Sequence, residues 1–206
     1  MTEPPIIAWD FDGVLNRNIR DGVFLWAESF EQDLGQSLDV FTKHVFADDF
    51  DRIITGQEDL RDRVASWVER VGFVPGPDAL LEYWFKKDAL PDVEVLKVQA
   101  ALSAKGIRHV IATNNEARRA RYIEVEMGFG DRAVHVFSSG RMGVRKPDPA
   151  FYAQITETLD VAPDRMLLID DYQASVDAAR AAGWQAHFFS DKSRDDVLDR
   201  LSAEFL

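Results

Sequence analysis

Five short apolar runs punctuate the chain, and each of them leads into polar residues. The first covers residues 6–11 and contains Asp10, and the others cover residues 108–112, 134–137, 165–169 and 185–189. Apolar runs of this length are typical of strands buried on both faces of a parallel sheet. We therefore expect strands whose carboxyl ends present polar side chains.

Segments with apolar residues at helical spacing alternate with these runs. They cover residues 93–104, 116–127, 149–159 and 174–182, and a glycine follows three of them, as expected after a helix C-terminus. Strands that alternate with helices of this length favour βαβ units. The pattern predicts an α/β fold with a doubly wound, Rossmann-like parallel sheet.

One long stretch, residues 16–91, breaks this rhythm. Apolar residues such as Trp26 and Phe30 recur there at helical spacing, and the stretch contains no convincing strand. We therefore expect a helical insertion that interrupts a core made of residues 1–15 and 92–206.

Composition narrows the possible partners. The 206 residues include 24 Lys and Arg against 36 Asp and Glu, a net charge of −12 that repels nucleic acid and anionic membranes. The chain has no cysteine, which excludes disulfides and Cys-based zinc sites and favours the reducing cytoplasm. It shows neither a secretion signal nor an apolar stretch long enough to span a membrane. The oligomeric state is open between monomer and dimer.

Polar side chains gather at the ends of four of the expected strands. Because ligands bind beyond the carboxyl ends of parallel strands, we expect these side chains to share one crevice. Carboxylates from separate strands repel one another unless a cation lies among them, and Mg²⁺ prefers such hard oxygen ligands. The sequence thus predicts a magnesium site. The polar side chains at these four strand ends are Asp10, Asp12, Thr113, Asn114, Lys146, Asp170 and Asp171.

The same residues suggest phosphoryl transfer. Asp10 is positioned to attack phosphorus as a carboxylate nucleophile, while the metal and Lys146 neutralise the phosphoryl oxygens and Thr113 donates a hydrogen bond to one of them. Asp12, two residues along the chain, is suited to protonate the leaving oxygen and then to deprotonate the attacking water.

Four segments, in this order and spacing, resemble the four motifs of the haloacid dehalogenase superfamily in its phosphatase form. The resemblance covers nearly the whole chain. The segments are residues 10–15 (Asp-Phe-Asp-Gly-Val-Leu), 111–114 (Ile-Ala-Thr-Asn), 145–152 (Arg-Lys-Pro-Asp-Pro-Ala-Phe-Tyr) and 168–171 (Leu-Ile-Asp-Asp), the last with Ala178 and Ala179.

The resemblance implies a role for each acid. Asp10 becomes the nucleophile and a metal ligand, and Asp12 the acid/base residue and, through its main-chain carbonyl, a further ligand. Asp171 supplies a metal carboxylate. Asp170 either binds the metal directly or, without contacting the metal, orients a metal-bound water. One position departs from the pattern, because Ser175 stands where the fourth motif often carries Asn or Asp.

For the phosphate, the resemblance implies Thr113 and Lys146 as binding residues. Asn114 either positions the phosphate or loop through its amide or simply forms a turn. The insertion resembles the small helical cap of subfamily I, and the region around Gly56 resembles sugar-phosphate phosphatases such as glucose-1-phosphatase. The expected substrate is therefore a small phosphorylated metabolite, because a cap over the crevice excludes polymers.

Three other functions share features with this one. Dehalogenation is disfavoured because dehalogenases of this superfamily lack the second acid, which is present here as Asp12. A signalling module of the receiver type is disfavoured for two reasons. Receivers lack an insertion such as residues 16–91, and they place the phosphorylated aspartate on the middle strand, whereas the acids here follow the first and fourth strands. A phosphomutase of the β-phosphoglucomutase type shares all four motifs and the cap type, so it stays open as the alternative to a phosphatase.

Overall fold

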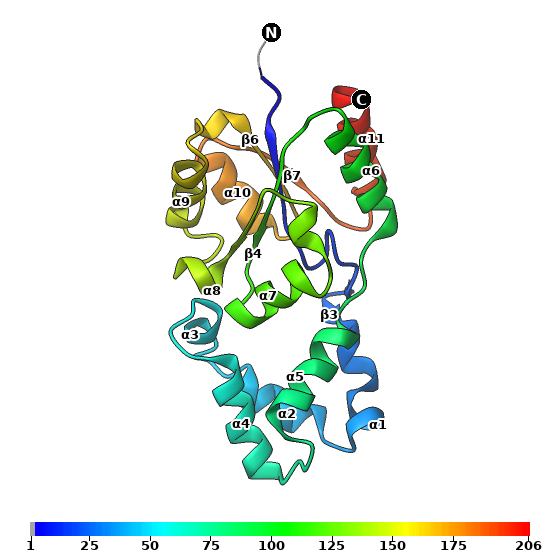
Figure 1. The fold of residues 1–206 in the computed structure, drawn as a ribbon, viewed down its shortest axis with the longest axis vertical. Coiled ribbons are helices and arrows are strands. Elements are labelled where there is room, and N and C mark those ends of the chain that lie inside the picture. The colour runs from blue at the N-terminus through cyan, green and yellow to red at the C-terminus, as the bar shows by residue number, and fades with distance from the viewer. Residues whose placement is uncertain (1–2) are drawn as a thin grey trace.

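A five-stranded parallel sheet forms the centre of the computed structural model, which describes residues 3–206 (Figure 1). The strand order is β5-β4-β1-β6-β7, and each neighbouring pair is parallel. The predicted α/β fold is therefore confirmed. The strands are β1 (Ile6–Trp9), β4 (His109–Thr113), β5 (His135–Ser138), β6 (Met166–Asp170) and β7 (Gln185–Phe188).

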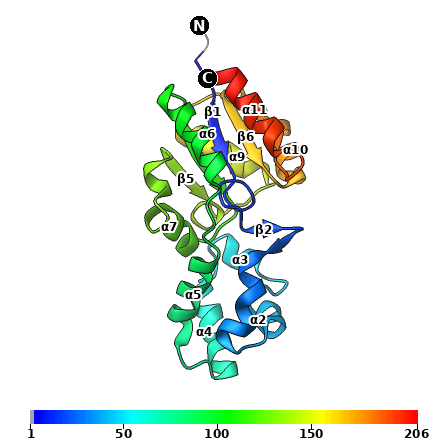
Figure 2. The ribbon, with the colours of Figure 1, turned by 90° about the vertical axis from the view of Figure 1, so that its right-hand side faces the viewer.

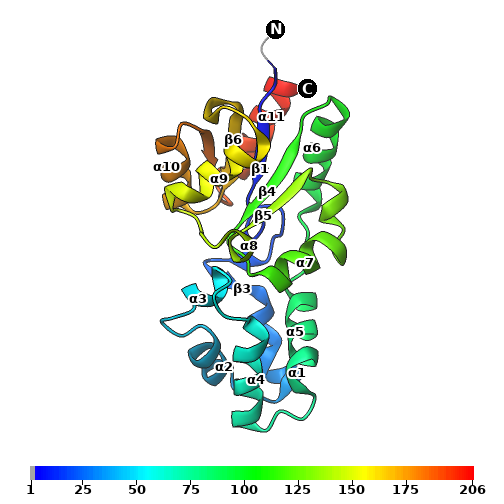
Figure 3. The same ribbon diagram turned by 60° about the vertical axis from the view of Figure 1, so that its left-hand side comes forward.

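Helices cover both faces of the sheet. One face packs against α6 (Val93–Ala104), α7 (Ala117–Val125) and α11 (Arg194–Phe205). The other packs against α9 (Pro149–Leu159) and α10 (Gln173–Ala181), and Figure 3 shows α6 and α9 on opposite sides of the strands. This arrangement is the doubly wound architecture that the alternating pattern predicts.

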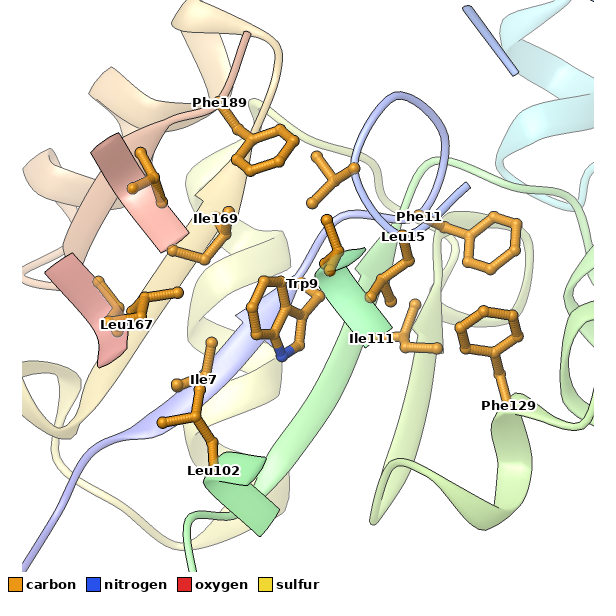
Figure 4. Close-up of a cluster of buried hydrophobic side chains, with 14 of the residues drawn as sticks. Ile7, Trp9, Phe11, Leu15, Leu102, Ile111, Phe129, Leu167, Ile169 and Phe189 are labelled. Carbon is orange, nitrogen blue, oxygen red and sulfur yellow. The ribbon is translucent and has the colours of Figure 1, made fainter. Parts of the chain in front are cut away.

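Strand β1 divides its side chains between these two faces because successive residues of a strand point to opposite sides. Ile7 and Trp9 pack toward α6 and α11, and Figure 4 shows both beside Leu102 of α6. Ile6 and Ala8 pack toward α9 and α10. All four side chains are buried, so β1 is the centre of the hydrophobic core.

Residues 25–87 form a helical lobe below the carboxyl ends of the strands (Figures 1 and 2). The lobe has its own aromatic core, in which Phe30, Phe41 and Trp67 are completely buried. None of the helices in residues 3–206 has the length and hydropathy needed to cross a membrane. The lobe contains η1 (Leu25–Ser29), α1 (Phe30–Leu34), α2 (Leu38–Val45), α3 (Asp51–Ile54), α4 (Leu60–Val71) and α5 (Gly76–Lys87).

Local signals explain where the helices of the lobe begin and end. The Asp59 side chain accepts a hydrogen bond from the Arg61 backbone N–H at the start of α4, and Gly72 ends that helix in the left-handed conformation. Ser37 caps α2 in the same way as Asp59 caps α4. Both helices therefore begin at a residue whose side chain accepts a hydrogen bond from the backbone of the first turn.

The structure differs from the sequence-based expectation in three places. β2 (Ile19–Arg20) and β3 (Val23–Phe24) form a small antiparallel hairpin in a region where the sequence pattern predicts no strand. Strands of two residues are too short to show alternation, although Asp21 and Gly22 both have the positive φ of a tight hairpin turn. The C-terminal helix α11 was also missed, and short α8 (Ser139–Met142) follows β5.

Candidate active site

The crevice lies beyond the carboxyl ends of β1 and β6, where the chain connections pass to opposite faces of the sheet. The chain leaves β1 toward α6 on one face and leaves β6 toward α10 on the other, so the loops after these two strands diverge. Asp10 follows β1, and Asp170 and Asp171 stand at the end of β6. The topology thus brings the acids of the first and fourth motifs together.

Lys146 lies between two of these acids. Its Nζ is 2.9 Å from Asp10 Oδ1 and 2.6 Å from Asp170 Oδ2. The side chains of Lys146 and Asp170 are 1% and 0% exposed, whereas that of Asp10 is 13% exposed. Although burial alone would lower the pKa of Lys146, the two carboxylates raise it, so the amine stays protonated. Of the three side chains, Asp10 is the one accessible to a ligand.

Three carboxylates form a compact oxygen cluster. Asp10, Asp170 and Asp171 each place one oxygen within 4.8 Å of the others. Burial raises the pKa of Asp10 well above its ordinary value, and it raises that of Asp171 to about 6, with the charge of Asp170 adding to the effect. One ammonium, that of Lys146, balances only part of this charge when all three acids ionise. Hard oxygen ligands with excess negative charge fit a divalent cation such as Mg²⁺.

Gly13 allows Asp171 to approach the first motif. Its backbone has φ of 79°, and a Cβ at this position would overlap the Asp171 carboxylate. A side chain would therefore displace a member of the oxygen cluster, which explains why glycine follows the second acid.

Asp12 lies outside the oxygen cluster and is held by three amides. Asn18 Nδ2 and Asn16 Nδ2 donate to Asp12 Oδ1, at 2.8 Å and 3.2 Å. Asn115 Nδ2 donates to Asp12 Oδ2 at 2.9 Å. These donors fix the orientation of the carboxyl group.

The second motif supplies two further polar contacts. Asn115 Nδ2 also donates to Thr113 Oγ1 at 2.8 Å, so one buried amide connects Thr113 with Asp12. Asn114 forms a reciprocal pair with the backbone of Lys146, in which its Nδ2 donates to the carbonyl and its Oδ1 accepts from the N–H, both at 2.9 Å. In this structure Asn114 holds the Lys146 loop in place.

A buried ion pair lies behind Asp12. The Arg119 Nη2 of α7 is 3.0 Å from Asp88 Oδ2 at the end of the helical lobe, and both side chains are less than 8% exposed. Asn18 Nδ2 donates to Asp88 Oδ1 at 2.7 Å as well as to Asp12. Burial, assisted by the charge of Asp12, raises the pKa of Asp88 to about 7. This network links the acid of the first motif to the segment where the lobe rejoins the sheet.

Other contacts hold the lobe over the crevice. Arg118 of α7 donates two hydrogen bonds to the Asp59 carboxylate, at 2.7 Å and 2.6 Å. Ser139 Oγ donates to the carbonyl of Ile54 at 2.6 Å. Gly56 lies so close to Gly140 that a Cβ at Gly56 would overlap the Gly140 carbonyl. The lobe is therefore in direct contact with the sheet side of the molecule.

A model of the haloacid dehalogenase-like hydrolases matches residues 4–183 of this chain. The chain belongs to this family. Its sequence resemblance to the superfamily is thereby confirmed over most of its length.

Relatives of this hydrolase include named phosphatases. A phosphoglycolate phosphatase of Rhodospirillum rubrum is 34% identical over 88 residues, which is 43% of this chain and 36% of that protein. A phosphatase of Mycobacterium tuberculosis is 32% identical over 126 residues, which is 60% of this chain and 57% of that protein. The matched segments thus span less than two thirds of the length of these relatives.

The fold of the hydrolase also occurs in solved structures. A haloacid dehalogenase family enzyme from Bacteroides thetaiotaomicron, in complex with magnesium and inorganic phosphate, superposes with a TM-score of 0.74 at 17% identity. The match covers 95% of this chain and 99% of that one. The two proteins therefore share the complete fold, including the helical lobe.

Five site residues of the hydrolase are not predicted by its sequence pattern. Asn16, Asn18 and Asn115 lie in loops, where asparagine is common for local reasons, and Asp88 and Arg119 are far apart in the sequence and meet only in the folded chain. Arg17 and Arg20, the cations that follow the first motif in the sequence, are exposed and pair with Asp191 and Glu28 respectively.

The atypical Ser175 is buried in the first turn of α10. Its carbonyl accepts a hydrogen bond from the Tyr152 hydroxyl at 2.8 Å. Among the side-chain hydrogen bonds of residues 3–206, none joins Ser175 Oγ to Lys146, which is held instead by Asp10 and Asp170.

Proposed function

We propose that this hydrolase cleaves small phosphomonoesters in a Mg²⁺-dependent reaction that passes through an aspartyl phosphate on Asp10. The observation that carries the proposal is the buried group in which Lys146 contacts both Asp10 and Asp170, with Asp171 in the same oxygen cluster. This arrangement combines a nucleophile, a fixed positive charge and a set of hard oxygen ligands. Asp12 lies beside it, oriented by three amides.

The oxygen cluster is the proposed metal site. Asp10, Asp170 and Asp171 would hold Mg²⁺, with the main-chain carbonyl of Asp12 as a further ligand. When bound, the ion would neutralise phosphoryl oxygens and allow the anionic ester to approach the acids. Its presence in the related Bacteroides structure supports this choice of cation.

In the first step, a carboxylate oxygen of Asp10 forms a bond to phosphorus while the bond from phosphorus to the ester oxygen breaks. Asp12 delivers its proton to that oxygen, so an alcohol leaves. Lys146 and Thr113 offset the negative charge on the phosphoryl oxygens. Asn114 contributes by keeping the Lys146 backbone in position.

In the second step, Asp12 removes a proton from a water molecule, whose oxygen attacks phosphorus. The bond between phosphorus and Asp10 then breaks, which releases inorganic phosphate and restores the carboxylate. Asp12 thus ends the cycle protonated and ready for the next ester. The proton that Asp12 gives up in the first step is therefore replaced in the second.

The helical lobe is the proposed cap. In this proposal residues 16–91 form a subfamily I cap, and residues 1–15 and 92–206 form the catalytic core. The contacts of Arg118, Ser139 and Gly56 with the facing surface support a closed position that excludes water. The proposed substrate class is a metabolite-sized phosphomonoester in the cytoplasm, within which the sequence resemblance alone suggests a sugar phosphate.

Phosphate release from a panel of phosphomonoesters tests the proposal. Wild type should release phosphate with Mg²⁺ and lose this activity when a chelator is added. Asp10→Asn should be inactive, whereas Asp196→Asn, which changes an exposed acid on α11, should behave as wild type. Metal-independent turnover, or full activity of Asp10→Asn, would refute the mechanism. Formation of an isomeric ester in place of free phosphate would identify a phosphomutase.

A further inference from the structure

An apolar cavity of about 220 Å³ adjoins the acid/base residue. Asp12, Asn114 and Asn115 line its sheet side, which places the cavity directly beyond the position of the ester oxygen in the proposed mechanism. In the proposed mechanism, the alcohol part of the ester would extend into this space. The opposite side is a wall of aromatic rings from Phe24, Trp26, Phe46, Phe50, Trp84 and Phe85.

These rings support one another and form a preformed surface. The centroid of Phe46 is 4.8 Å from that of Phe50 and 5.4 Å from that of Trp84, and Trp26 lies 5.2 Å from Trp84. Phe46 nevertheless keeps 37% of its surface exposed, and Phe24 keeps 40%. Exposed aromatic surface inside a crevice is costly in water and becomes favourable when an apolar ligand covers it.

The charges around the cavity disfavour an anionic alcohol. Among the described residues that line it, the cation is Arg119, whose guanidinium already contacts the Asp88 carboxylate and the carbonyls of Phe85 and Asp88. Asp12, Asp88 and Glu116 contribute acids to the same lining. A carboxylate or a second phosphate would meet these acids without an available positive charge.

A polyhydroxylated alcohol also fits poorly. Apart from Asp88, the lining side chains from residues 24–88 are six aromatic rings together with Ile54 and Leu60, so their polar groups are limited to the two indole N–H groups of Trp26 and Trp84. Sugar hydroxyls buried against such a wall would lose their hydrogen bonds to water without replacement.

We infer that the preferred substrate is the phosphate ester of a neutral, apolar alcohol that carries a single ring or a branched alkyl group. The inference rests on the proposed phosphatase function and adds the chemistry of the leaving group. The size is suitable, because an apolar cavity of about 150 Å³ already admits benzene. The preference differs from that of a phosphoglycolate phosphatase, whose substrate carries a carboxylate.

Specificity constants of the wild-type enzyme with Mg²⁺ test the inference. The esters to compare are benzyl phosphate, 2-phosphoglycolate, glucose 6-phosphate and choline phosphate. Benzyl phosphate is chosen over phenyl phosphate because phenol is intrinsically a better leaving group than an alkyl alcohol. We expect kcat/KM for benzyl phosphate to exceed each of the others by at least about tenfold.

Two variants separate the cavity from general effects on the lobe. Phe46→Ala removes a partly exposed ring of the cavity wall and should lower kcat/KM for benzyl phosphate by about tenfold, with little change for 2-phosphoglycolate. Phe73→Ala removes a ring that packs against Trp67 in the lobe and does not line the cavity, so it should leave the ratio between the two esters unchanged.

The outcomes distinguish this inference from the proposed function. A preference for 2-phosphoglycolate or glucose 6-phosphate would overturn the apolar leaving group and leave the phosphatase intact. A preference for choline phosphate would mean that the acids, rather than the neutral apolar surface, select the substrate, and would also overturn the inference. No phosphate release from any of the four esters would refute the proposed function and the inference with it.

Discussion

On the sheet side of the crevice the charged and amide side chains hold one another in place, whereas on the lobe side the wall consists mainly of aromatic rings. Lys146 lies between two carboxylates, and Asp12 accepts hydrogen bonds from three amides. The rings of Trp26, Phe46 and Trp84 contact one another without such directed bonds. Reaction chemistry requires fixed polar geometry, while selection of an apolar group requires only surface and shape.

This difference predicts that changes on the sheet side reduce the rate for every substrate. Changes on the lobe side should instead alter the ratio between substrates. Asp88 connects the two sides, because it contacts both Arg119 of α7 and Asn18 beside the first motif.

The largest effect should follow from Lys146→Met. This variant removes the ammonium between Asp10 and Asp170 and leaves their repulsion unbalanced, so kcat should fall by about 10²- to 10³-fold for all esters. Steady-state kinetics on two dissimilar esters measures the change. Lys105→Met, which alters an exposed lysine at the end of α6, is the control. A loss confined to one ester would contradict a role of Lys146 in the phosphoryl-transfer step that all esters share.

The next largest effect should come from Asn115→Leu. The substitution removes the amide that donates to both Asp12 and Thr113. Because the amide orients Asp12, the proposed acid/base residue, kcat should fall by about 10- to 100-fold while KM changes by less than about threefold. If KM rose and kcat stayed constant, Asn115 would belong to substrate binding rather than to orientation of Asp12.

A smaller and more selective effect is expected from Phe46→Arg on the lobe side. A guanidinium at this partly exposed position would supply the cation that the cavity wall lacks. The ratio of kcat/KM for 2-phosphoglycolate to that for benzyl phosphate should rise by about tenfold or more. Phe46→Leu, which keeps the wall apolar, should leave the order of the two esters unchanged. An equal loss for both esters in Phe46→Arg would argue against a cavity that selects by charge.

The smallest effect should come from the contact that holds the lobe closed. Arg118 and Asp59 are both partly exposed, so their ion pair is worth at most about 1 kcal/mol. Arg118→Ala should therefore raise KM by about two- to fivefold, and high salt should produce part of this change in wild type. Asp59→Asn, which retains a side-chain oxygen to cap α4, should have a similar effect. Additive effects in the double variant would show that the two residues act independently.

Much of the fold and of the polar site could be predicted from the sequence. The alternation of apolar runs and helical segments is a local signal, and the acids at the ends of β1 and β6 meet because parallel strands end at one edge. Asp10, Asp170 and Asp171 accordingly form one cluster, and Lys146 contacts two of them.

The rest depends on tertiary structure. Asn115 lies in the loop between β4 and α7, where asparagine is common for local reasons, so its sequence context does not reveal that its amide reaches Asp12. Asp88 and Arg119 pair only because the end of α5 packs against α7. The aromatic residues of the lobe show helical spacing whether they face its core or the cavity. Sequence therefore did not separate Phe30, which is completely buried, from Phe46 at the cavity.

The most direct test of the central claim is the chemical identity of residue 10 during turnover. The enzyme is mixed with Mg²⁺ and an ester that it hydrolyses, quenched in acid, and treated with borohydride, which reduces an aspartyl phosphate to homoserine. Peptide mass spectrometry should then find homoserine at position 10 and nowhere else. Unmodified Asp10 in an enzyme that releases phosphate under the same conditions, or homoserine at Asp12, Asp170 or Asp171, would contradict the account.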